Sequence, residues 1–243
     1  MNNSLEKQDF DIKAEDLKKS YGNFEALRGV DLSVKNGEFY TLFGPNGAGK
    51  TTLTKLLATL TDPTSGKLSV LGIDVKKDVQ KIRSTIGVIS HDPYLYETLT
   101  AFENIKFFGE LYGIADINER AQSVIKQVGL ESRSNDLVRT FSRGMKQRLT
   151  VARAIVHEPK ILLLDEPYTG LDQHGAQIFG EMLSQLKKQN RTIIMTTHNI
   201  DEGLDLSDRV GILSKGKIVY DSPTSQTDPI NFKDLYISKV ENS

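Results

Sequence analysis

The feature that most constrains how this chain can fold is a glycine-rich run with the pattern G-x-x-x-x-G-K-[ST]: Gly44, Pro45, Asn46, Gly47, Ala48, Gly49, Lys50, Thr51 and Thr52. The apolar run at 38–43 predicts a strand before it, and helical spacing follows it at Leu53, Leu56, Leu57 and Leu60. A strand, a glycine loop and a helix in this order let successive backbone N–H groups surround phosphate oxygens. The pattern predicts a nucleoside triphosphate site, and a glycine-rich turn without a ligand is the alternative.

Two carboxylates at the end of a second strand supply the other half of the predicted site. Asp165 and Glu166 follow the apolar run at 161–164, at the edge where ligands bind in open α/β sheets. We expect Asp165 to hold Mg²⁺ together with the Thr51 hydroxyl, and Lys50 to reach the β- and γ-phosphates. Glu166 is expected to orient and deprotonate the attacking water. A polar strand end that only caps a loop is the simpler interpretation.

A histidine follows another apolar run in the same way. His198 comes directly after 192–197, so we expect it at the same edge of the sheet as the two carboxylates. An imidazole there can donate a hydrogen bond to the γ-phosphate or to the attacking water. A purely structural hydrogen bond is the alternative, and the neighbouring motifs favour the catalytic role.

The composition of the 243-residue chain excludes several other classes of function. Its 31 Lys and Arg balance 32 Asp and Glu, so no global field favours nucleic acid or an anionic membrane, and we expect no nucleic-acid partner. The absence of cysteine excludes disulfides, thiolate metal sites and a cysteine nucleophile. No apolar run approaches the roughly 20 residues that cross a bilayer, and the polar run at 1–9 is no signal peptide. We therefore expect a cytoplasmic chain that meets a membrane only through a partner.

The hydrophobic pattern predicts an α/β fold with a helical insertion. Strands are expected within 12–34 and at 67–71, 85–90, 161–164 and 192–196, with a closing hairpin at 210–213 and 217–220. Helical periodicity extends from about 101 to 157 and returns at 176–189, and a last amphipathic turn or two carries Phe232, Leu235, Tyr236 and Val240. The unbroken apolar runs are typical of parallel strands covered on both faces.

With these motifs in order, residues 12–222 resemble the ATP-binding cassette (ABC) ATPases. The most specific support is a segment similar to the family's L-S-G-G-Q signature, followed by Ala152-Arg153-Ala154 and Glu158-Pro159: Phe141, Ser142, Arg143, Gly144, Met145, Lys146, Gln147, Arg148 and Leu149. The family's D-loop is matched by Thr169-Gly170-Leu171-Asp172. Tyr21 matches an aromatic residue that stacks on adenine in the family, and an ordinary edge tyrosine is the alternative.

The resemblance implies a single domain in three parts. A P-loop core with an antiparallel β-subdomain is expected at 12–91 and 159–222, a helical subdomain at 92–158 and a C-terminal tail at 223–243. It also implies a dimer, because in the family the signature faces the γ-phosphate held by the other subunit. Ser142, Arg143, Gly144 and Asp172 are therefore expected at the partner's nucleotide, with Ser142 capping a helix that starts near Gly144.

Two departures from the family pattern concern the site. His91 stands where the family has a glutamine that touches Mg²⁺, and because Mg²⁺ prefers oxygen ligands we expect only an indirect role for it. In the signature, Arg143 and Met145 replace a glycine and a glutamine. Arg143 either adds a cation near phosphate or points to solvent. The first is favoured, since arginine at a helix N-terminus opposes the dipole unless an anion is near.

The resemblance implies the nucleotide-binding subunit of a transporter that uses ATP and Mg²⁺. It would bind transmembrane permease subunits and a second cassette, alike or different, at the cytoplasmic face of the membrane. Export is favoured, with a likeness to heme-exporter or multidrug-type subunits. A surface for the permease is expected around 94–108, where core positions and exposed anchors are both open interpretations for Leu95, Tyr96, Leu99 and Phe102. A soluble cassette that couples ATP to assembly or regulation is the alternative.

Overall fold

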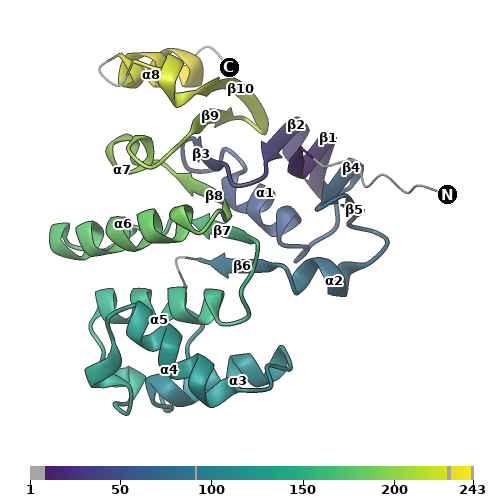
Figure 1. The fold of residues 1–243 in the computed structure, drawn as a ribbon. Helices are drawn as coiled ribbons and strands as arrows, with labels where there is room; N and C mark the ends of the chain where they lie inside the picture. The colour runs from purple at the N-terminus through teal and green to yellow at the C-terminus, as the bar shows by residue number, and fades with distance from the viewer. Residues whose placement is uncertain (1–8, 91, 229–230, 242–243) are drawn as a thin grey trace.

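The computed structural model describes residues 9–90, 92–228 and 231–241, and two β-sheets organise it (Figure 1). The larger sheet has six strands in the order β10-β9-β3-β8-β7-β6. Its strands are β3 (Phe39–Phe43), β6 (Ile86–Ile89), β7 (Ile161–Asp165), β8 (Thr192–Thr197), β9 (Arg209–Ser214) and β10 (Lys217–Pro223). All its pairings are parallel except that of β10 with β9, so the predicted mainly parallel α/β fold is confirmed.

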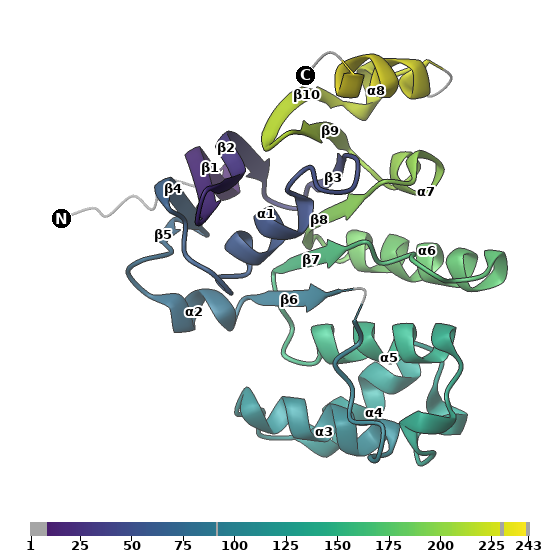
Figure 2. The same ribbon diagram turned by 180° about the vertical axis from the view of Figure 1, so that it is seen from behind.

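The smaller sheet is antiparallel, with strand order β2-β1-β4-β5. Its strands are β1 (Phe10–Tyr21), β2 (Phe24–Lys35), β4 (Ser65–Val70) and β5 (Ile73–Asp74). Helix α1 (Lys50–Leu57) lies between this sheet and the larger one, and α2 (Val79–Arg83) leads from the small sheet to β6 (Figures 1 and 2). The strands expected within 12–34 are thus β1 and β2, and they form a sheet of their own.

Period-two alternation divides the larger sheet between two apolar cores. Leu162 and Leu164 of β7 pack in a core with the helices on one face, whereas Ile161 and Leu163 pack with α1 and the antiparallel sheet on the other. Every residue of β7 is buried, which explains why the sequence of this strand is an unbroken apolar run.

The remaining helices form two groups. One group lies together on the far side of β6 and consists of α3 (Ala101–Leu111), α4 (Ile117–Gln127) and α5 (Arg143–Ile155) (Figure 1). The other group lies beside the strands of the larger sheet and consists of α6 (Gln173–Lys188), α7 (Ile200–Leu204) and α8 (Phe232–Glu241). Short 3₁₀ turns lie at Glu131–Arg133, Val138–Thr140 and Thr224–Gln226. Helix α8 is anchored by Phe232, which is buried with its ring centroid 5.1 Å from that of Phe43.

The expected boundaries between the parts of the domain fall mostly in connecting segments. The boundary at 91/92 lies between β6 and α3, and the boundary at 158/159 lies between α5 and β7. The boundary after residue 222 falls one residue before the end of β10. The division into three parts stays a proposal. In the described ranges 9–90, 92–228 and 231–241, no helix is long and apolar enough to cross a membrane.

Two helix ends differ from the sequence pattern. Helix α1 ends at Leu57, because Thr59 adopts a positive φ of 56° and the Leu60 N–H donates back to the Lys55 carbonyl at 2.8 Å. Leu60, expected on the apolar face of this helix, is 63% exposed as a result. Helix α6 begins at Gln173, three residues before the expected start, because the Asp172 carboxylate accepts the Gly175 N–H at 2.7 Å.

A stacked pair joins the helical group to the sheet. The rings of Tyr112 and His157 are parallel, with centroids 3.8 Å apart, and His157 Nε2 lies 3.0 Å from the Ile86 carbonyl oxygen. Burial lowers the pKa of His157 to about 4. The folded chain therefore holds this imidazole neutral at pH values where the unfolded chain binds a proton.

We predict that acid weakens the fold through His157. The folded pKa lies below that of the unfolded chain, so the stability is present above pH 6.5 and lost as the pH falls toward 4. Urea titrations should give a free energy of unfolding about 2 kcal/mol lower at pH 5 than at pH 7 from this group. His157→Gln should show a smaller pH dependence. Equal pH dependence in the two proteins would contradict the assignment.

Candidate active site

The glycine loop at 44–49 is wedged between the two sheets. A Cβ on Gly44 would lie 2.4 Å from the Leu213 carbonyl oxygen, and one on Gly49 would lie 2.6 Å from the Ala26 carbonyl oxygen. Gly49 also has a φ of 110°, a backbone conformation that other residues rarely adopt. A side chain at either position would therefore clash with a backbone carbonyl group, which explains why the G-x-x-x-x-G-K-[ST] pattern has glycine at both positions.

The helix that follows the loop begins with unpaired donors. Gly49 is the N-cap residue of α1, and among the described residues the helix has no side-chain cap for the N–H groups of its first turn. These donors and the positive end of the helix dipole face a hollow of about 240 Å³. It is lined by Phe24, Ala26, Pro45, Asn46, Gly47, Gly49, Lys50, Thr51, Thr52 and Glu166. The hollow is therefore suited to an anion.

Aromatic side chains lie near this hollow on the first hairpin. Phe24 lines the hollow and is 60% exposed, although the sequence reasoning did not single it out. Tyr21, the residue expected to stack on adenine, is 48% exposed, is not among the lining residues, and has the Lys19 ammonium 5.0 Å from its ring centroid. The hairpin position of Phe24, next to the turn that carries Tyr21, is the signal that could have identified it.

Lys50 is a buried cation whose partners all belong to the loop and the opposite strand end. Its Nζ donates to the Gly44 carbonyl at 2.6 Å and to the Pro45 carbonyl at 3.2 Å, and lies 3.1 Å from Glu166 Oε1. Only 6% of its surface is exposed. Burial of an ammonium group is costly unless it is paired, so these oxygens fix Lys50 at the base of the hollow.

Glu166 connects Lys50 to His198. While Oε1 faces Lys50, Oε2 lies 2.8 Å from His198 Nδ1. Oε1 is buried and has no hydrogen-bond partner of good geometry among the described residues. The backbone of Glu166 has a positive φ of 51°, which turns its side chain from the end of β7 toward the loop. The arrangement offers a half-buried carboxylate that retains capacity to accept a proton from water.

Asp165 is the buried last residue of β7. Its side chain is only 4% exposed, and its Oδ1 accepts a hydrogen bond from Thr196 Oγ1 at 2.6 Å. Thr196 belongs to the neighbouring strand β8 and was not predicted as part of the site, because its partner is set by the register of β7 with β8. Carboxylate and hydroxyl oxygens are ligands that Mg²⁺ prefers, and the joint role of Asp165 and Thr51 in holding the ion stays a prediction.

Another acidic group borders this region. Burial raises the pKa of Glu202 on α7, His198 opposes that effect, and the charges of Glu166 and Asp201 add to it. The carboxylates at this edge of the sheet therefore interact electrostatically. Of the expected site residues, Lys50, Glu166 and His198 are brought together here, whereas His91 lies outside the described residues.

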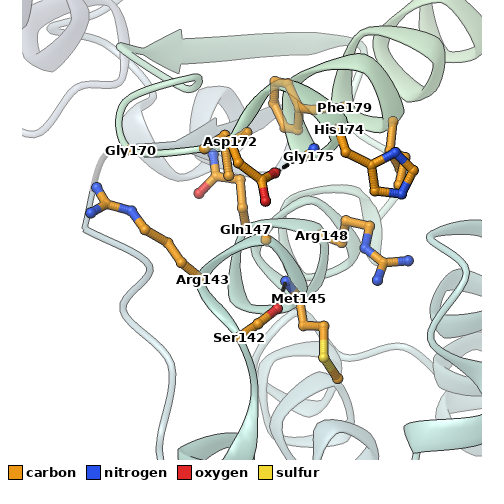
Figure 3. A pocket seen from close by; sticks show the side chains of 13 residues that line it. Ser142, Arg143, Met145, Gln147, Arg148, Gly170, Asp172, His174, Gly175 and Phe179 are labelled. Carbon is orange, nitrogen blue, oxygen red and sulfur yellow. Dashed lines mark hydrogen bonds between the residues drawn. The ribbon is translucent and has the colours of Figure 1, made fainter.

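The signature segment lines a second hollow of about 330 Å³, which shares no lining residue with the first (Figure 3). Two helix N-termini meet there. Ser142 caps α5 by accepting the Met145 N–H at 3.2 Å, and Asp172 caps α6. The helix expected near Gly144 begins at Arg143. In this chain, therefore, the signature residues and the glycine loop form separate parts of the surface.

Two side chains of α5 contact the segment after Glu166. Gln147 Nε2 donates to the Pro167 carbonyl at 2.8 Å, and Arg143 Nη2 donates to the Thr169 carbonyl at 2.8 Å. The phosphate contact expected of Arg143 stays a prediction, since the expected phosphate would be held by a second cassette. Within its own chain the exposed guanidinium has the Thr169 carbonyl as a partner.

A comparison of the sequence with models of known protein families agrees with this site. The family model described as "ABC transporter" covers residues 27–169, from β2 through the glycine loop and signature to the segment after Glu166. The chain belongs to the ABC transporter family. The predicted family resemblance is thereby confirmed.

Curated relatives and a solved cassette agree with this assignment. The linearmycin resistance ATP-binding protein LnrL of Bacillus subtilis (strain 168) is 38% identical over 210 residues, covering 86% of this chain and 68% of the relative. The bacitracin transport ATP-binding protein BcrA of Bacillus licheniformis is 39% identical over 225 residues, covering 92% and 73%. A dimeric ATP-binding cassette in a post-hydrolysis state, bound to ADP and Pi, superposes with a TM-score of 0.81 at 28% identity, covering 88% and 98%.

We predict that Thr196 supports Asp165 in this ABC cassette. Thr196→Val keeps the shape of the side chain but leaves the buried carboxylate without its donor. Urea denaturation should show a free energy of unfolding lower by about 1–3 kcal/mol. Thr196→Ser retains the hydroxyl and should lose less. An equal loss in both variants would show that packing of the methyl group, and not the hydrogen bond, is responsible.

Proposed function

We propose that this cassette hydrolyses ATP as the nucleotide-binding subunit of an ABC transporter and drives export through separate membrane subunits. The observation that carries the proposal is the arrangement of Lys50, Glu166 and His198 beside the glycine loop, with Lys50 Nζ 3.1 Å from Glu166 Oε1 and His198 Nδ1 2.8 Å from Oε2. A cation for the phosphates and a base for water thus lie at one hollow.

The residues of this hollow fit a nucleotide and its metal. The first-turn donors of α1 have no side-chain cap and suit phosphate oxygens, while the neighbouring hairpin offers Tyr21 to the base. Thr51 and Asp165 would hold Mg²⁺, which when bound neutralises charge on the phosphate oxygens. Binding of phosphate would also give Lys50 anionic partners in place of the two loop carbonyls that it now contacts.

Glu166 is proposed as the general base and His198 as the group that orients it. The Glu166 carboxylate, whose Oε1 lies 3.1 Å from Lys50 Nζ, is proposed to accept a proton from the attacking water, and the hydrogen bond from His198 Nδ1 to Oε2 limits its rotation. His91 is proposed to act indirectly, in place of the family's glutamine. These assignments use side chains from the ends of β7 and β8, where parallel strands bring them together.

A second cassette is proposed to complete each nucleotide site. The signature hollow and the glycine loop share no residue within one chain, and the solved cassette with a TM-score of 0.81 is dimeric. Ser142, Gly144 and Asp172 would therefore contact the nucleotide of the partner, whereas Arg143 is held by the Thr169 carbonyl of its own chain. Ser142 and the first turn of α5 offer a helix N-terminus to an anion.

The permease surface is proposed at the aromatic cluster of Tyr94, Tyr96, Phe107 and Phe108. Tyr94 is 67% exposed and Tyr96 is 47% exposed, while Phe107 and Phe108 pack edge to face with centroids 5.4 Å apart. Exposed aromatic groups of this kind mark protein interfaces. Leu95 and Phe102, by contrast, pack partly buried against the core. The assignment to export is supported by the names of two relatives, which refer to linearmycin resistance and bacitracin transport.

We predict that Glu166→Gln binds ATP without turning it over. The amide cannot accept the proton of the attacking water, so release of phosphate should fall by about 100-fold or more. Size-exclusion chromatography with ATP and Mg²⁺ should then show a persistent dimer, because the γ-phosphate that joins the two chains is retained. Lys50→Ala is the matched control and should lose nucleotide binding itself. Normal hydrolysis by Glu166→Gln would move the role of base to another residue.

We predict that Tyr94→Asp combined with Phe107→Asp weakens association with the membrane. Charges in the aromatic cluster would have to be desolvated at the interface, so less of the chain should be recovered with the membranes of its native host. Leu60→Asp, at an apolar position that is 63% exposed, is the control for adding charge elsewhere. Equal recovery of all three proteins would contradict this surface, and absence of the wild-type chain from the membranes would support a soluble cassette that couples ATP to assembly or regulation.

A further inference from the structure

Arg143 is a cation at an unfavourable place in its helix. It is the first residue of α5, where the positive end of the helix dipole repels a guanidinium. The structure gives it a compensating partner outside the helix, because Nη2 donates to the Thr169 carbonyl at 2.8 Å. Figure 3 shows the side chain extending from α5 toward the segment that contains Gly170.

The loop is shaped to receive this group. A Cβ on Gly170 would lie 2.0 Å from the Arg143 Cζ and 2.4 Å from both terminal nitrogens, so the guanidinium occupies the space that a side chain would fill. Gly170 also has a φ of 74°, which any other residue adopts only with strain. The guanidinium therefore makes contact with the loop as well as a hydrogen bond.

The same loop leads directly to Glu166. The Thr169 N–H donates to the Glu166 carbonyl at 3.2 Å, so the peptide groups on both sides of Thr169 link Arg143 to Glu166. Glu166 has a positive φ of 51°, a backbone state that persists only when its surroundings hold it. At the far end of the segment, Asp172 is fixed as the cap of α6.

We propose that Arg143 is a positioning residue that holds the loop at 167–171 and thereby the backbone of Glu166. The inference rests on the proposed ATPase function and deepens it. It connects the signature, which faces the partner's nucleotide, with the base of the chain's own site. Arg143 is exposed, so its contact adds little to global stability, and its effect lies in the local order of the loop.

The first test does not depend on catalysis. Hydrogen exchange of the nucleotide-free chain is followed by mass spectrometry in the wild type and in Arg143→Ala. Peptides that span 166–172 should exchange about 10-fold faster in the variant, since a loop with fewer constraints opens more often. Peptides from α1 should be unchanged. Arg139→Ala removes an equal charge four residues upstream and should match the wild type. Unchanged exchange at 166–172 in Arg143→Ala would overturn the proposal.

The second test separates positioning from nucleotide binding. For Arg143→Ala we expect kcat for ATP hydrolysis to fall about 10-fold with KM within about twofold of the wild type, because the base is misplaced while the glycine loop is untouched. Arg143→Lys should recover only part of kcat, since an ammonium can donate to Thr169 but cannot lie flat against Gly170. A raised KM with unchanged kcat would overturn the proposal and assign Arg143 to the partner's phosphate.

A double-mutant cycle with Gly170→Ala supplies an independent check. The added Cβ displaces the guanidinium, so its effect on kcat should be smaller in an Arg143→Ala background than in the wild type. The strain of alanine at this φ is common to both backgrounds and cancels in the cycle. Strictly additive effects would overturn the contact. A wild-type chain that does not hydrolyse ATP would defeat the proposed function, and hydrogen exchange would still decide whether Arg143 holds the loop.

Discussion

The pairing of the buried Lys50 ammonium with the Glu166 carboxylate organises the candidate site. Their distance of 3.1 Å links the loop after β3 with the end of β7, two segments more than 100 residues apart in the sequence. The Lys50 ammonium is buried and the Glu166 carboxylate is partly buried, so the carboxylate supplies the negative charge that compensates the buried cation. A phosphate anion that binds in the hollow would therefore compete with Glu166 for the Lys50 ammonium.

The parallel sheet explains how such distant residues converge. Asp165 and Glu166 end β7, His198 follows β8 and the glycine loop follows β3, and these three strands are neighbours with their carboxyl ends at one edge. Helices α1 and α6 begin after the segments that follow β3 and β7. A polar side chain directly after each apolar strand is therefore enough, because the order of the parallel strands brings these side chains to the same edge of the sheet.

The sequence predicted the elements of this arrangement better than their contacts. The glycine loop, the all-apolar β7 and the helical insertion each have a local pattern, and the structure has them at the expected places. Thr196 was missed because its contact with Asp165 depends on strand register, and the Arg143 contact with Thr169 depends on how α5 docks. Leu60 was misassigned because threonine adopted the left-handed turn that usually requires glycine.

The close approach of Gly44 and Gly49 to the carbonyl groups of Leu213 and Ala26 has an evolutionary consequence. The same loop packs between the two sheets and lines the candidate phosphate site. A larger side chain at either glycine would therefore separate the sheets and change the shape of the site at once. The backbones of β2 and β9 are consequently restrained as well, because the carbonyl groups of Ala26 and Leu213 lie against the loop.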